Sequence, residues 1–252
     1  MLRARIIPCL LLKDGGLVKS VKFKDHKYVG DPINAVKIFN EKEVDEIVVL
    51  DIDASAEGRE PNYRLIENLA RECRMPLCYG GGIKTVQQAN RIFALGVEKI
   101  AISSAAVSDI GLVSALAAEV GSQSVVVILD VKKRSFGRGY EIYINNGKTG
   151  TGLSPVEFCK QLQEHGVGEI CLNAIDRDGM MEGYDLDLIS AVHKCVKVPM
   201  TVLGGAGSLD HIKDMIARFG IIGVAAGSLF VFKGAYKAVL ISYPSRQERG
   251  LL

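Results

Sequence analysis

The chain has 252 residues, of which 48% are hydrophobic and 24% charged, so it is long enough to bury one large core. Its net charge of +2 offers no electrostatic argument for a nucleic-acid-binding protein. No apolar run approaches the roughly 18 residues that a membrane helix needs, so we expect a soluble protein.

The first apolar run, residues 6–12, follows basic residues and therefore resembles the start of a secretion signal. It is short, lacks a small-residue cleavage site and stops at Lys13-Asp14-Gly15, which favours a buried strand. Six cysteines are scattered along the chain without a CxxC pair, as is typical of reduced thiols. We therefore expect a cytoplasmic protein.

Eight short β-branched apolar runs recur along the chain, and their nearly continuous hydrophobicity predicts strands buried on both faces, as in parallel sheets. Amphipathic stretches with helical spacing lie between them, for example at residues 31–44, 85–97, 154–167 and 208–221. The alternation predicts one α/β domain over residues 1–252, a (β/α)₈ TIM barrel. A Rossmann sheet is the alternative, but no GxGxxG motif follows the first run. The runs are residues 6–12, 47–52, 76–80, 99–103, 124–131, 169–175, 199–205 and 222–227.

The chain also repeats itself at about half its length. YGGGIK at residues 79–84 matches LGGAGS at residues 203–208, and Ile52-Asp53 corresponds to Ile175-Asp176. Two half-barrels of four βα units explain this spacing. Coincidence among glycine-rich barrel loops is the alternative.

Glycine-rich loops follow the third and seventh strands, at residues 80–82 and 204–207, and each precedes a helix. Backbone N–H groups that glycine leaves accessible at a helix N-terminus can bind phosphate without a cation. Ser103-Ser104 and Ala226-Gly227-Ser228 follow the fourth and eighth strands and complete the two seats. Close packing alone can also account for such glycines. The repeat favours two phosphate seats across one barrel mouth, for a ligand phosphorylated at both ends.

Asp130 ends the fifth strand, where a carboxyl group is a candidate general acid or base, although such residues also cap loops. Asp176 and Asp178 follow the sixth strand. Aligning the two halves places Leu11 at the position equivalent to Asp130. Two-carboxylate acid/base chemistry would need an aspartate at position 11.

Four charged residues precede apolar runs at the other end of the predicted barrel. They can point to solvent, or two cations and two anions can pair into a closed ring across the barrel floor. Because burying such a ring is weak evidence of stability, a ring would favour a functional role. The four residues are Arg5, Glu46, Lys99 and Glu169. The four histidines have no metal-ligand spacing, so we expect neither a metal nor another cofactor.

The segments RIIPCLLLKDG, DEIVVLDIDAS, YGGGIKT, GVEKIAI, GVGEICL, IDRDG, LGGAGS and AAGSLF run in order across essentially the whole chain. Together they resemble the HisF family, the cyclase subunits of imidazole glycerol phosphate synthase. The resemblance implies that a HisH-type glutaminase binds the barrel floor near Glu98 and Lys99. Ammonia then passes through the barrel to a phosphorylated substrate at the mouth.

The resemblance also assigns roles to individual residues. It makes the ring of four charges an ammonia gate, and it places Lys19 in a mobile loop, roughly residues 15–31, that closes over substrate. The two catalytic aspartates of the family map to Asp130 and to position 11, which is leucine. The phosphate seats that it implies comprise Gly81, Gly82, Ser104, Asp178, Gly179, Gly205, Ala226 and Gly227. The segments after the fourth and eighth strands add Ser103 and Ser228.

Leu11 is a departure from the family pattern, because an alkyl chain cannot transfer a proton. Ser103 and Leu203 also differ from the usual asparagine and small polar residue. This pattern resembles a HisF-like branch of surface-polysaccharide pathways, such as O-antigen biosynthesis. That branch works with a HisH-type glutaminase and a separate amidotransferase to convert an acetamido group on a sugar into an acetamidino group. Histidine biosynthesis and a non-catalytic barrel that only activates the glutaminase are the alternatives.

Overall fold

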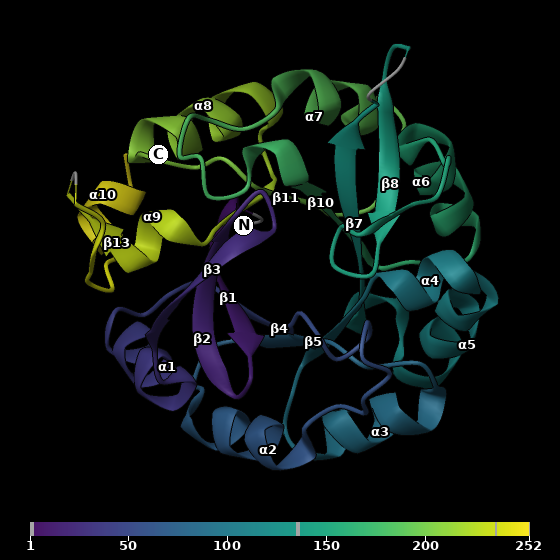
Figure 1. Cartoon of the computed structure of the whole chain (residues 1–252), viewed down its shortest axis with the longest axis horizontal. Helices are drawn as coiled ribbons and strands as arrows, with labels where there is room; N and C mark the ends of the chain where they lie inside the picture. Colours follow the sequence, from purple (N-terminus) through teal and green to yellow (C-terminus); the bar gives the residue numbers. More distant parts are fainter. Residues whose placement is uncertain (1–2, 135–136, 235, 252) are drawn as a thin grey trace.

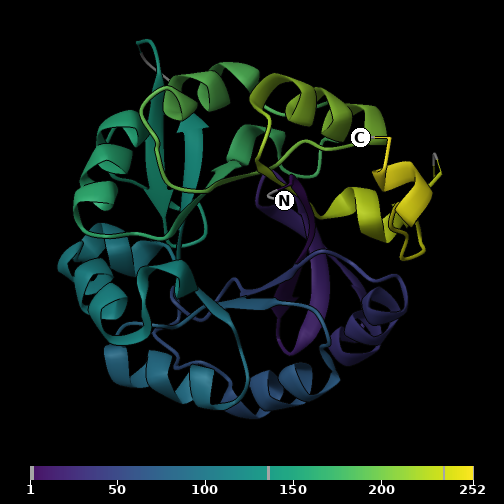
Figure 2. The same cartoon turned by 180° about the vertical axis from the view of Figure 1, so that it is seen from behind.

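Eight parallel strands form a closed barrel in the computed structural model, which describes residues 3–134, 137–234 and 236–251. Each strand pairs in parallel with the next, and β12 pairs with residues 5–8 of β1 to close the barrel. The barrel is seen end-on in Figure 1 and from behind in Figure 2. The predicted (β/α)₈ fold is confirmed, since each predicted run overlaps one of these strands. They are β1 (Arg5–Lys13), β4 (Ile47–Asp51), β5 (Leu77–Gly80), β6 (Lys99–Ile102), β7 (Val125–Lys133), β10 (Glu169–Ala174), β11 (Met200–Leu203) and β12 (Gly223–Ala226).

Helices connect these strands and surround the barrel (Figure 1). The predicted amphipathic stretches form helices with side-chain caps: Asp31 accepts a hydrogen bond from the Asn34 amide at 2.8 Å, and Thr85 and Gln88 form a capping box. The connecting helices are α1 (Pro32–Glu41), α2 (Tyr63–Glu72), α3 (Val86–Ala94), α4 (Ser104–Ser108), α5 (Gly111–Val120), α6 (Pro155–Glu164), α7 (Leu186–His193) and α8 (Leu209–Phe219), with 3₁₀ turns η1 (Ser122–Ser124) and η2 (Ile175–Arg177).

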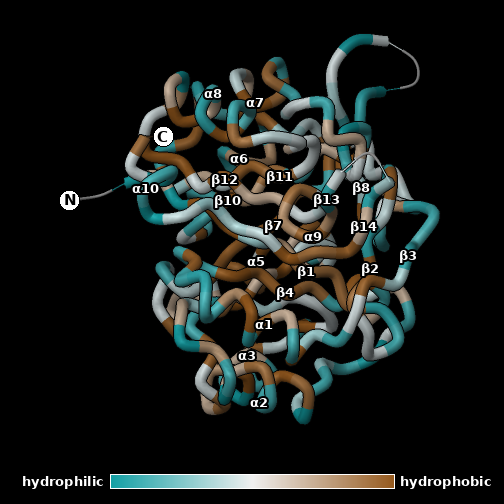
Figure 3. Tube along the Cα trace, turned by 90° about the vertical axis from the view of Figure 1, so that its left-hand side faces the viewer, coloured by the Kyte–Doolittle hydropathy of each residue, from teal (hydrophilic) through white to brown (hydrophobic). Residues whose placement is uncertain are grey.

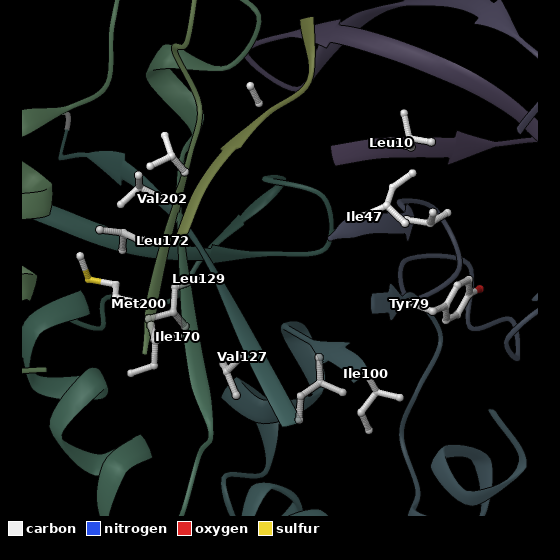
Figure 4. Packing of buried hydrophobic residues seen from close by; sticks show 14 of the residues in the cluster. Leu10, Ile47, Tyr79, Ile100, Val127, Leu129, Ile170, Leu172, Met200 and Val202 are labelled. Carbon is white, nitrogen blue, oxygen red and sulfur yellow. The ribbon is translucent and has the colours of Figure 1, made fainter. Parts of the chain in front are cut away.

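Successive side chains of each barrel strand face opposite sides, which explains the nearly continuous apolar runs. On β7, Val127 and Leu129 belong to the large cluster that packs under the helices, part of which Figure 4 shows. Val126 and Ile128 belong instead to a small cluster inside the barrel. The inward positions therefore line the barrel axis, and the outward positions hold the helices.

Two antiparallel hairpins extend barrel strands at the mouth. One consists of β2 (Gly16–Val21) and β3 (Lys24–Gly30), and β2 pairs with the end of β1. The other consists of β8 (Tyr140–Ile144) and β9 (Thr149–Gly150), and β8 pairs with the end of β7. Because β1 and β7 are equivalent in the repeat, both half-barrels carry an extension at the same place.

The segment over residues 15–31, which the sequence led us to treat as a loop, is thus largely a β-hairpin. Asp14 and Gly15 have φ values of 50° and 76°, as a two-residue hairpin turn of the right twist requires. This turn reverses the chain directly onto β1 and keeps the backbone groups of the segment paired.

The chain ends differently from the other βα units. After β12 come α9 (Ser228–Val231), the two-stranded β13 (Phe232–Lys233) and β14 (Ala238–Val239), and α10 (Arg246–Arg249). These elements lie outside the barrel, between α8 and α1 (Figure 1). Within the described ranges, every helix is too short or too polar to traverse a lipid bilayer.

Candidate active site at the barrel mouth

A cavity of about 1160 Å³ opens at the carboxyl ends of the barrel strands. In (β/α)₈ barrels this end carries the active site. The structure brings all the predicted catalytic and phosphate-seat residues to the wall of this one cavity: Lys19, Gly81, Gly82, Ser103, Ser104, Asp130, Asp178, Gly179, Gly205, Ala226, Gly227 and Ser228.

Asp130 is the carboxyl group best placed for proton transfer. Burial raises its pKa to about 7, with a smaller contribution from the nearby Asp178 carboxylate, whereas a hydrogen bond from Asn173 acts in the opposite direction. The Asn173 Nδ2 donates to Asp130 Oδ1 at 2.8 Å. A carboxyl group with a pKa near 7 exchanges protons readily at neutral pH, as a general acid or base must.

Asn173 is a cavity residue that sequence reasoning missed. It lies on β10 at the same inward register as Glu169 and Cys171, and its Oδ1 is buried without a hydrogen-bond partner among the described residues. An unpaired buried carbonyl oxygen costs free energy unless a ligand N–H or water satisfies it. The signal in the sequence is a polar residue four positions after Glu169, within an apolar strand.

Leu11 lines the same cavity as Asp130. It stands on β1, where it pairs in register with Leu50 of β4 and Val18 of β2. Four steps around the barrel separate β1 from β7 in either direction, so Leu11 and Asp130 approach the cavity from opposite walls. Asp14 is in the β1–β2 turn and is not among the residues that line the cavity.

Lys19 lies on β2, within the β2–β3 hairpin, and is buried. Its Nζ donates to the Cys9 carbonyl at 2.6 Å, and burial lowers its pKa. The lysine head also occupies the space over Gly227, where an added Cβ would meet Nζ at 2.8 Å. The lysine that the resemblance implies is thus at the cavity wall, beside one predicted phosphate seat.

The β2–β3 hairpin is fastened to the loop after β10. Asp178 Oδ2 accepts hydrogen bonds from Ser20 Oγ at 2.7 Å and from the Phe23 amide at 3.2 Å, and the Lys22 amide donates to the Asp178 carbonyl at 2.9 Å. Burial raises the pKa of Asp178. The hairpin therefore covers the Asp178-Gly179 side of the mouth.

The central glycines of the two glycine-rich loops have similar backbone conformations. Gly81 and Gly205 adopt φ values of 122° and 110°, which side chains rarely tolerate. A Cβ on Gly81 would meet the Asp51 carbonyl at 2.5 Å, and one on Gly205 would meet the Gly183 carbonyl at 2.2 Å. Close packing thus accounts for these glycines in both halves, and the loops still form opposite parts of the cavity wall.

The four charged residues at the barrel floor form a closed ring. Lys99 Nζ contacts Glu46 Oε1 and Glu169 Oε2, each at 3.0 Å, and Arg5 pairs with Glu169 Oε1 at 2.7 Å and with Glu46. Although burial opposes ionisation, the two cations hold the pKa of Glu169 at about 2. Of the two possibilities that the sequence left open for these charges, the structure has the paired ring.

A narrow apolar lumen lies between the ring and the mouth. Burial raises the pKa of its thiols, to about 11 for Cys9, so they are neutral at physiological pH. Above the ring, its described lining carries no charged side chain: Ile7, Cys9, Val48, Cys78, Val126, Ile128, Cys171, Leu203 and Ala225. A small neutral molecule fits this path better than an ion does.

The chain matches the family described as "Histidine biosynthesis protein" over residues 5–237. It is 59% identical over 252 residues to the "Putative imidazole glycerol phosphate synthase subunit HisF" of Leptospira borgpetersenii, which covers 100% of this chain and 99% of that protein. A Vibrio vulnificus protein of that name, designated hisF3, is 59% identical over 249 residues, or 99% and 96% of the two chains. The "Imidazole glycerol phosphate synthase subunit HisF" of Hyphomonas neptunium is 42% identical over 232 residues, or 92% and 91%.

The family match over residues 5–237 includes the ring residues at the barrel floor and the residues that line the cavity at its mouth. The chain therefore belongs to the histidine biosynthesis protein family, as a HisF-like subunit of the imidazole glycerol phosphate synthase type.

Proposed function

We propose that the chain is the ammonia-receiving barrel of a glutamine amidotransferase complex. A HisH-type glutaminase supplies ammonia at the barrel floor, and the ammonia is used to convert an acetamido group of a surface-polysaccharide sugar into an acetamidino group. A separate amidotransferase takes part in that conversion. The observation that carries the proposal is Leu11, an alkyl side chain on the cavity wall across from Asp130.

The ring and the lumen support the ammonia path. Glu46 and Glu169 are each shared between two cations, so the ring is closed and must part to admit a molecule. Beyond the ring, an ammonium ion would lose its hydration among apolar side chains and neutral thiols, whereas neutral ammonia would not. The ring is therefore the ammonia gate in this proposal.

The mouth supports a phosphorylated sugar or a nucleotide-like substrate. The amides of the loops at Gly82 and Gly205 and the hydroxyl groups of Ser104 and Ser228 are the proposed phosphate donors. Lys19 adds a cation near Gly227. Asp130 then accepts or returns a proton where the ammonia enters the cavity.

Histidine-type cyclisation is the alternative that the relatives' names favour. Losing one positioned acid or base typically costs ~10²–10⁴ in rate, and position 11 carries no such group. A barrel that only binds and activates the glutaminase is the second alternative, and the buried, pKa-shifted Asp130 argues against it.

The test follows the amide nitrogen. The chain, the cognate glutaminase and the separate amidotransferase are incubated with glutamine carrying an isotope-labelled amide nitrogen and with an acetamido sugar linked to a nucleotide. We expect the label in the acetamidino group of the product. If the histidine precursor is supplied instead, label in imidazole glycerol phosphate would indicate that the protein acts in histidine biosynthesis. Label released only as ammonia in both reactions would favour the non-catalytic barrel.

A further inference from the structure

A second pocket lies at the barrel floor, away from the cavity described above. It has a volume of about 1030 Å³ and lies among the start of the chain, the segments before β4 and β5, and α10. In Figure 3, α10 lies at the left end of the barrel, whereas β3 and β8 lie at the right end. We call it the arginine pocket, because four arginines and two acidic residues line it: Arg3, Arg74, Arg246, Arg249, Glu43 and Asp45.

The cations of the arginine pocket outnumber its anions. Arg3 and Arg249 share one oxygen of Asp45, at 2.7 and 3.0 Å, and Arg246 pairs with Glu43 at 2.7 Å. Arg74 forms no ion pair within the described ranges. Among the described residues that line it, the pocket therefore has more positive than negative charge.

One donor of the pocket is both buried and unused. The side chain of Arg249 is only 9% exposed, yet its Nε has no hydrogen-bond partner among the described residues. A buried guanidinium donor that lacks an acceptor costs free energy, which an added carboxylate or phosphate oxygen would recover. Burial, an unused donor and excess charge thus point to an anionic ligand.

The arginine pocket also connects to the ring at the barrel floor. Asp45 Oδ2 accepts a hydrogen bond from the Ile6 amide at 2.9 Å, and Tyr243 donates to the Ile6 carbonyl at 2.8 Å. Ile6 follows Arg5 in the chain, and Glu46 follows Asp45. The Asp45 carboxylate, which Arg3 and Arg249 share, therefore holds the backbone next to the ring residues Arg5 and Glu46.

We propose that the arginine pocket receives an aspartate or glutamate side chain of the glutaminase, which competes with Asp45 for Arg3 and Arg249. This inference rests on the proposed function, which places that partner at the floor. A protein side chain fits better than a free ion, because Arg3 and Arg246 are 69% and 80% exposed and can close around a projecting group. Displacement of Asp45 would change its hydrogen bond to the Ile6 amide, and docking would thereby affect the neighbouring ring residues Arg5 and Glu46.

The experiment measures the Kd between the full chain and the cognate glutaminase by calorimetry, at low and high salt. R74E and R246E should each weaken binding about tenfold or more and reduce its salt dependence. R74A is a milder change and should weaken binding less than R74E does. It serves as a second variant in case R74E fails to fold. The matched control is R64E, an exposed arginine at the start of α2, on the mouth side, which should bind like the wild type. One Asp→Lys or Glu→Lys change on the glutaminase should restore binding to R74E.

The outcomes separate this inference from the proposed function. A wild-type chain that binds no glutaminase contradicts the proposed function, and the inference fails with it. Wild-type affinity in R74E, R246E and R74A overturns the arginine pocket alone. Inorganic phosphate that stabilises the free wild-type chain but not R74E, together with unchanged glutaminase affinity, would identify a small-anion site and also overturn the proposal.

Discussion

Leu11 and Asp130 are equivalent in sequence but differ in chemistry. The sequence placed both at strand ends on the barrel mouth, because the repeat aligns β1 with β7, and both line the cavity. The pKa of Asp130 could not be predicted from sequence, because it depends on desolvation and on the Asn173 hydrogen bond. Asn173 is 43 residues away from Asp130 in the chain.

The wild-type chain should turn over the bisphosphorylated histidine precursor with free ammonia very poorly, because position 11 has no proton to transfer. Leu11→Asp should recover part of the rate, up to the ~10²–10⁴ of a positioned acid or base. Initial rates at saturating ammonia measure the effect. Leu11→Asn, of similar size but without an acid, is the control and should recover nothing. Rapid wild-type cyclisation would contradict the expectation.

Asp130 should make the stability of the fold depend on pH. Its pKa is about 7 in the folded state and about 3.9 when unfolded, so the folded state binds more protons between these values. The contribution of Asp130 to the free energy of unfolding is therefore fully present below about pH 4 and is lost as pH rises through 7. Asp130→Asn should therefore raise the free energy of unfolding at pH 8 by about 4 kcal/mol relative to its effect at pH 4, since each pKa unit corresponds to about 1.4 kcal/mol.

Urea unfolding of the wild type and the variant at both pH values tests this prediction. Asp25→Asn removes an exposed carboxyl group from β3 and should show no such difference. Equal effects of Asp130→Asn at the two pH values would show that the carboxyl group titrates normally.

The elements that the sequence predicted are those buried on two faces or amphipathic along their length. The eight barrel strands and the capped helices have these signals, whereas β2, β3 and β8 lie at the rim and mix charged with apolar residues. The Asp14-Gly15 dipeptide was the available signal for the first hairpin. The attachment of this hairpin to Asp178 depends on a contact between residues far apart in the chain, which spacing cannot reveal.

Removing the Asp178 carboxylate should loosen the β2–β3 hairpin. Asp178→Ala deletes the acceptor for Ser20 and Phe23, and losing about 1.4 kcal/mol of local stability corresponds to roughly tenfold faster amide exchange. Hydrogen–deuterium exchange of residues 16–30 measures this. Glu182→Ala, an exposed change in the same loop, is the control. Unchanged exchange in Asp178→Ala would mean that the strand pairing alone holds the hairpin.

At the scale of the whole molecule, the barrel arranges the inward side chains in layers. On β10, Glu169 reaches the floor ring, Cys171 the lumen and Asn173 the mouth. The charges at the strand starts made the ring one of two possibilities that the sequence left open. It did not predict that Thr201 would join, donating to Glu169 at 2.5 Å, because threonine is common in strands for its β-branched shape alone.

The two halves should each bind one phosphate. Crystals soaked in inorganic phosphate should show one anion near Gly82 and Ser104 and another near Gly205 and Gly227, where Lys19 Nζ adds a donor. Electron density at the two seats, without added metal, is the expected result. Anions elsewhere in the mouth, with both loops empty, would contradict the assignment.

The near-repetition of the two halves has a consequence for how a ligand lies in the mouth. The similar φ values of Gly81 and Gly205 and a hairpin on each side would give a doubly phosphorylated molecule similar surroundings at both ends. Turned end for end, it would exchange its phosphates but present a different carbon to Asp130. In the proposed function, the unlike pair of Leu11 and Asp130 would give the cavity a polarity: only one orientation would place the reacting carbon at Asp130.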